Sequence, residues 1–72
     1  MKMRYMLTTD GLRIVMRWSD THPPESYSWR DGKWVQDVGR WWHSRMESND
    51  YEDIDAERAR AEVEKLGGNF DA

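Results

Sequence analysis

The sequence predicts an α+β fold in which two consecutive β-hairpins form an antiparallel sheet packed against two C-terminal α-helices. Two observations predict the hairpins: Asp-Gly occurs at 10–11 and again at 31–32, and each pair lies between runs that alternate in polarity. A third predicts the helices, because Asp37 and Asp55 each precede apolar residues at helical spacing.

Length and composition favour one small domain over residues 1–72, with the sheet in 1–36 and the helical part in 37–72. A chain of 72 residues buries roughly 60% of its surface on folding, which suits one core. Because the chain has no cysteine, a disulfide scaffold and thiolate metal sites are excluded. Its five tryptophans are therefore expected to supply much of the core.

The first hairpin is predicted to turn at Asp10-Gly11 through a two-residue type I′ turn. This register pairs Leu7 with Ile14, Tyr5 with Met16 and Met3 with Trp18, all on one face. The opposite face then carries three arginines, Arg4, Arg13 and Arg17. A connector containing Pro23 and Pro24 follows.

The second hairpin is predicted to turn at Asp31-Gly32, which places Trp29 opposite Trp34. With Trp18, these two tryptophans are assigned to one buried sheet face.

Two helices are expected after the sheet. The first begins at Asp37 and runs to Met46, with Val38, one of Trp41 and Trp42, and Met46 at helical spacing. Trp41 and Trp42 lie about 100° apart on a helix, so we expect one inside and the other at a rim.

The second helix follows an Asp55 cap, buries a stripe of Ala56, Ala59, Val63 and Leu66, and ends at Gly67-Gly68. Residues 48–50 are expected to link the two helices, and Phe70 to fold back onto the stripe.

The net charge of −3 is unevenly distributed. Residues 1–46 hold eight Lys and Arg against five Asp and Glu, whereas residues 47–72 hold three against nine. The acidic segment from Glu47 to Glu64 is interpreted either as a solvated helix surface or as a nucleic-acid mimic that inhibits a basic partner, as in some small phage or mobile-element proteins.

Catalysis is not expected, because the sequence has no phosphate-binding loop, dinucleotide fingerprint or serine elbow. His43 and Glu47 lie one helical turn apart, but a metal site needs three or four ligands, so neither a metal nor another cofactor is predicted. No targeting or membrane-spanning segment is recognised, and a cytoplasmic protein without a membrane partner is expected.

The function predicted is that of a non-catalytic protein-interaction or regulatory module. Tryptophan and arginine are enriched at binding hot spots, and the first helix concentrates both. The predicted partner-binding residues are Arg40, Trp41, Trp42 and Arg45, with a protein partner or a second copy as ligand. The alternative is nucleic-acid binding through Arg4, Arg13 and Arg17 with stacking aromatics.

Overall fold

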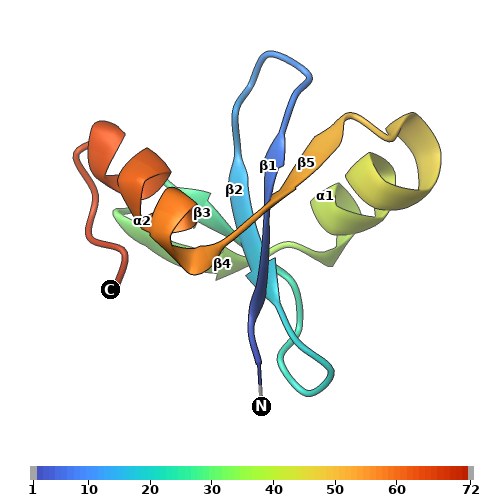
Figure 1. Ribbon diagram of the computed structural model, residues 1–72, viewed down its shortest axis with the longest axis horizontal. Helices are drawn as coiled ribbons and strands as arrows, with labels where there is room; N and C mark the ends of the chain where they lie inside the picture. Colours follow the sequence, from blue (N-terminus) through green and yellow to red (C-terminus); the bar gives the residue numbers. More distant parts are fainter. Residues whose placement is uncertain (1, 72) are drawn as a thin grey trace.

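An antiparallel sheet of five strands lies between two helical segments, one on each face (Figure 1). The computed structural model describes residues 2–71, so Met1 and Ala72, the ends of the predicted domain, lie outside the described residues. The strand order is β4-β3-β2-β1-β5. The strands are β1 (Arg4–Thr8), β2 (Val15–Trp18), β3 (Glu25–Ser28), β4 (Lys33–Gln36) and β5 (Tyr51–Ile54). The helical segments are α1 (Val38–Trp42), which continues as the π-helix η1 (His43–Ser48), and α2 (Ala56–Lys65). The α+β class is confirmed.

The predicted helical part contains a strand that sequence patterning missed. β5 pairs antiparallel with β1, with Tyr5 opposite Ile54 and Thr8 opposite Tyr51. The chain therefore crosses the sheet edge between its two helices, which is why α1 and α2 lie on opposite faces (Figure 1). The predicted hairpins gather their apolar residues on one face of the sheet, which implies that both helices cover that face, and this expectation is wrong.

The register of the first hairpin differs by one residue from the prediction. Leu7 pairs with Val15 and Met6 with Met16, instead of Leu7 with Ile14 and Tyr5 with Met16. A type I′ turn needs positive φ at both central residues, but Gly11 has φ +94° while Asp10 is not among the positive-φ residues. The Asp10 carboxylate accepts a hydrogen bond from the Leu12 amide at 3.1 Å, which stabilises a longer loop over residues 9–13.

The second hairpin also has a longer loop than predicted. Trp34 pairs with Tyr27, not with Trp29, and residues 29–32 form the connection. Trp29 therefore lies in the turn, where 67% of its surface is exposed. Its assignment to the core is wrong, whereas Trp18 and Trp34 are buried as expected, although on opposite faces of the sheet.

Each face of the sheet has its own core. On the α2 side the buried residues are Leu7, Val15, Tyr27, Trp34, Ala59, Val63 and Phe70. On the α1 side Met6, Met16 and Trp18 are buried, and Ile14, Trp41 and Tyr51 pack against them. Because a helix covers each face of the sheet, apolar side chains are needed on both faces of the strands. The alternation of apolar and polar residues therefore does not distinguish the predicted register of the first hairpin from the observed one.

The helix boundaries follow their predicted caps. Asp37 accepts from the Arg40 amide at 3.1 Å, and Asp55 from the Arg58 amide at 2.8 Å. After α2, Gly67 takes φ +79° and the Gly68 amide bonds the Val63 carbonyl at 3.1 Å, so the predicted glycine stop is confirmed. Of the predicted stripe on α2, Ala59 and Val63 are buried, while Ala56 and Leu66 are exposed.

Candidate functional site

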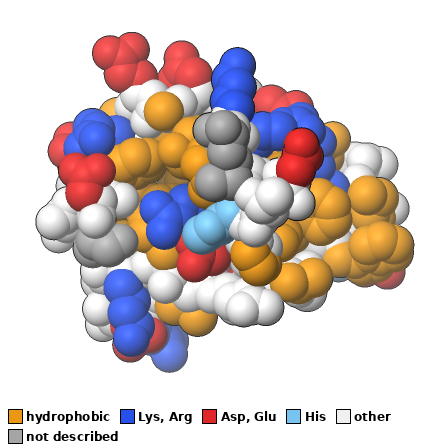
Figure 2. Space-filling view, turned by 90° about the horizontal axis from the view of Figure 1, so that it is seen from below, with side chains coloured by type: hydrophobic (Ala, Val, Ile, Leu, Met, Phe, Trp, Pro, Cys, Tyr) orange, Lys and Arg blue, Asp and Glu red, His pale blue; other side chains and the backbone are white. Residues whose placement is uncertain are grey.

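Three large apolar side chains lie exposed on the outer side of α1 and η1. Val38, Trp42 and Met46 are 48%, 55% and 53% exposed. They follow one another at intervals of four residues and so lie along one side of the helix. We call them the outer stripe. Figure 2 shows hydrophobic side chains gathered on this side of the molecule.

The outer stripe crosses from α1 into an unusual segment. η1 is a π-helix from His43 to Ser48, and it ends at Asn49 with left-handed geometry, φ +56°. π-Helical turns are rare in proteins and are frequent at functional sites. The segment positions Met46 one turn beyond Trp42 and keeps both side chains outside the core.

The structure separates the four predicted partner-binding residues. Trp42 is exposed, whereas Trp41 is half-buried and packs edge-on against Trp18 with 5.9 Å between ring centroids. The expectation that one of the two tryptophans packs inward is met by Trp41. Arg40 is held in an ion pair with Asp10 at 3.0 Å.

Arg45 is an integral part of the core on the α1 side. Its guanidinium lies 4.4 Å from the Tyr51 ring centroid and 4.9 Å from that of Trp18. It also pairs with Asp53 at 3.0 Å, and only 15% of its side chain is exposed. Arg45 thus joins η1 to β5, so truncating it changes the stability of the protein as well as its surface.

Exposed carboxylates follow the outer stripe along the chain, from η1 into β5. Glu47 and Asp53 have side chains that are 62% and 59% exposed, and Asp50 between them in the sequence is also exposed. Glu47 contacts His43 at 3.2 Å, and the segment from Glu47 to Glu57 contains no basic residue. We call Glu47, Asp50 and Asp53 the acidic border.

The three arginines of the nucleic-acid alternative do not form one surface. Arg17 pairs with Glu25 at 2.7 Å and lies 4.3 Å from the Trp34 ring on the α2 face. Arg4 is stacked 5.3 Å from the Trp18 ring on the other face. Arg13 lies in the β1–β2 loop, so the one-residue shift in register disperses the predicted cluster.

Arg13 contributes to a charge cluster around one buried carboxylate. Glu62 is 5% exposed and lies 3.2 Å from Arg13, 3.0 Å from Arg58 and 3.5 Å from Lys65. Burial raises the pKa of Glu62, but the hydrogen bonds from Arg58 and Arg13 outweigh it and hold the pKa below its ordinary value of 4.5.

Acid is expected to destabilise the protein through this group. A carboxylate with a lowered folded-state pKa stabilises the fold fully above its unfolded-state pKa, and that contribution is lost as the pH falls through the folded-state value. Glu62→Gln should therefore lower the free energy of unfolding at pH 7 by about 1–3 kcal/mol and flatten its decline below about pH 5. Urea denaturation at a series of pH values measures the free energy of unfolding of both proteins. If this free energy falls with decreasing pH equally in Glu62→Gln and in the unsubstituted protein, the prediction is contradicted.

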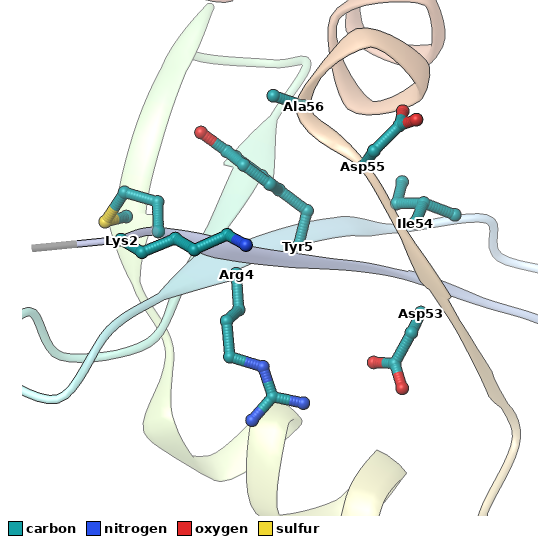
Figure 3. Close-up of a pocket in the computed structure, with 8 residues that line it drawn as sticks. Lys2, Arg4, Tyr5, Asp53, Ile54, Asp55 and Ala56 are labelled. Atoms are coloured by element: carbon teal, nitrogen blue, oxygen red, sulfur yellow. The ribbon is translucent and has the colours of Figure 1, made fainter.

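An open groove of about 720 Å³ runs along β1 beside the start of α2. Its charged residues are Lys2, Arg4, Asp53 and Asp55. Figure 3 shows Arg4 and Asp53 on one side of β1, and Tyr5 and Asp55 on the other. Because two cationic side chains and two carboxylates line the groove, it favours no charge class of ligand.

Comparisons with protein families, with curated proteins and with solved structures give no match. Within residues 2–71, no group of three or more His, Cys, Asp or Glu side chains is arranged to hold a metal ion, and no helix is both long and apolar enough to cross a membrane.

Proposed function

We propose that this protein is a non-catalytic interaction module whose outer stripe binds a basic amphipathic segment of a partner protein. The observation that carries the proposal is the exposed row of Val38, Trp42 and Met46 on one helical segment. Apolar side chains in such a row are the pattern by which one helix packs against another. Trp42 lies at the centre of the row, where binding energy concentrates.

The charge of the partner follows from the acidic border. Glu47 follows Met46 directly in the sequence, Asp50 lies two residues beyond η1, and Asp53 is paired with Arg45 of η1. The chain as a whole carries a net charge of −3. A partner with Lys or Arg flanking its apolar residues would pair with these carboxylates, whereas an acidic partner would be repelled. The stripe rises only about 12 Å along the helix, so the interface is small and the affinity is expected to be on the order of micromolar.

A direct test uses a synthetic helical peptide of leucine and lysine, with a leucine and glutamate peptide of equal length as control. Calorimetry should show that the leucine and lysine peptide binds the protein and that the leucine and glutamate peptide does not. Trp42→Ala should weaken that binding at least about tenfold, because it removes the central anchor. Trp29→Ala is the matched control, since it removes another exposed tryptophan elsewhere on the molecule and should leave the affinity unchanged.

The alternatives give different results in the same experiment. A nucleic-acid mimic would bind through carboxylates alone, so Trp42→Ala would leave its affinity unchanged while Asp50→Lys would reduce it. Self-association through the stripe would appear as a dimer in sedimentation that Trp42→Ala converts to monomer. Either outcome would overturn the proposed apolar docking of a basic partner.

A further inference from the structure

A second group of exposed apolar side chains lies at a different place in the fold. Leu12, Trp29 and Leu66 are each at least 49% exposed, and all three line one open groove of about 380 Å³. The groove lies where β2 and β3 separate. Within residues 2–71, these strands are paired only at Met16 with Ser26 and at Arg17 with Glu25. The β1–β2 loop, the β3–β4 turn and the end of α2 form its walls.

The charge of this groove is opposite in sign to that of the whole chain. Arg13 and Arg30 line it, and no Asp or Glu among residues 2–71 is a lining residue. The nearby carboxylate of Glu62 is already paired with Arg13, Arg58 and Lys65, so this cluster retains an excess of positive charge. An anionic group in the groove would therefore be attracted.

The exposed Trp29 ring beside Arg30 favours a ligand with a flat aromatic group. Trp29 is 67% exposed, and the Arg30 guanidinium lies 5.8 Å from its ring centroid. An aromatic ring stacked on this indole would place a substituent beside the Arg30 charge. The lining residue Tyr27 is buried and its hydroxyl lies against Gly68, so Trp29 and Arg30 offer the exposed groups on this side of the groove.

The backbone of the groove also shows local strain. Arg13 has φ +52°, one of two non-glycine residues with positive φ in the described chain. Strain of this kind persists where the surrounding structure fixes it, and it is concentrated at ligand sites. Here it belongs to Arg13, which lines the groove.

We propose that the groove between β2 and β3 binds a small aromatic anion, with its ring on Trp29 and its charged group between Arg13 and Arg30. Neither the outer stripe nor its partner takes part, so this site is independent of the proposed function. The same chemistry occurs in a nucleoside monophosphate and in an aromatic carboxylate such as the C-terminus of a peptide. A groove of this size is at the small end of ligand sites.

The test titrates the full chain with adenosine monophosphate and, separately, with N-acetylphenylalanine, while NMR records the Trp29 indole signal. Adenosine and N-acetylphenylalanine amide are the uncharged controls. At least one of the two anions should bind with a dissociation constant below about 1 mM, and its uncharged analogue should bind at least about tenfold more weakly. The arm that responds identifies the source of the ligand.

Two variants separate the proposal from non-specific binding. Arg30→Gln and Trp29→Ala should each weaken binding of the anion at least about tenfold. Neither substitution should unfold the protein, because both side chains are exposed. Trp42→Ala should have no effect. The proposal is overturned if neither anion shifts the Trp29 signal at millimolar concentration, if the uncharged analogues bind equally well, or if Arg30→Gln leaves the affinity unchanged.

Discussion

Trp34→Ala is expected to lower the free energy of unfolding by about 3–5 kcal/mol, the cost of truncating a large buried aromatic side chain. Trp34 is 8% exposed and packs edge-on against Tyr27 and Phe70, with centroid separations of 5.6 and 6.0 Å. Its indole N–H donates to the Phe70 carbonyl at 3.0 Å and so fixes the C-terminal segment on α2's side of the sheet. For a domain of this size such a loss is a large fraction of the total stability.

Chemical denaturation followed by circular dichroism measures the effect, with Trp29→Ala as the matched control. The exposed tryptophan should change stability by less than about 0.5 kcal/mol. The free energy of unfolding of Trp34→Phe should lie between those of Trp34→Ala and Trp29→Ala, because phenylalanine keeps an aromatic ring but leaves the Phe70 carbonyl without its hydrogen-bond donor. Equal stability of Trp34→Ala and Trp29→Ala would contradict the core described here.

Gly68→Ala is expected to destabilise the protein by about 1–3 kcal/mol, because the added methyl group overlaps the buried Tyr27 side chain. A Cβ at this position would overlap the hydroxyl and two carbons of the ring. The ring lies in the core on α2's side and packs against Trp34, so it cannot turn away without disturbing that contact.

Gly39→Ala is the matched control, with the opposite sign. A Cβ at Gly39 meets no atom within 4 Å, and the residue lies in α1 without positive φ. Alanine there should stabilise the protein by about 0.5–1 kcal/mol through its greater helix propensity. Thermal unfolding of both variants tests the pair, and a stabilising Gly68→Ala would show that the Tyr27 packing is wrong.

The features that could be predicted from the sequence are the local ones. Asp37 and Asp55 cap helices, and Gly67 ends α2, because each of these effects depends on a few neighbouring residues. Phe70 returns to the core as expected. The α+β class follows from these local elements together.

The features that could not be predicted depend on residues distant in the sequence. β5 contains Glu52 and Asp53 at its centre, which is unfavourable for a strand by composition, and it forms by pairing with β1 more than forty residues away. β5 lies between α1 and α2 in the chain and sends them to opposite faces of the sheet. Both predicted hairpin registers were based on the assumption that only one face is buried, and this assumption was wrong.

The same error determined which site residues were recognised. Trp42 was predicted as a binding residue, whereas Val38 and Met46 were recognised only for their helical spacing and are also exposed. Trp29 was assigned to the core and instead lines a groove with Leu12 and Leu66. Apolar character alone did not show which of these side chains are buried. Among the described residues, seven large hydrophobic side chains are exposed.

The proposed docking surface is tested most directly by NMR mapping of the isotope-labelled protein during titration with the leucine and lysine peptide. The amide signals that shift should belong to residues 38–48 and to the acidic border, and the Trp42 indole signal should shift with them. Trp42→Ala should remove these shifts while the rest of the spectrum stays that of a folded protein. Shifts centred on Leu12, Trp29 and Leu66, or shifts that persist unchanged in Trp42→Ala, would contradict the outer stripe as the docking surface.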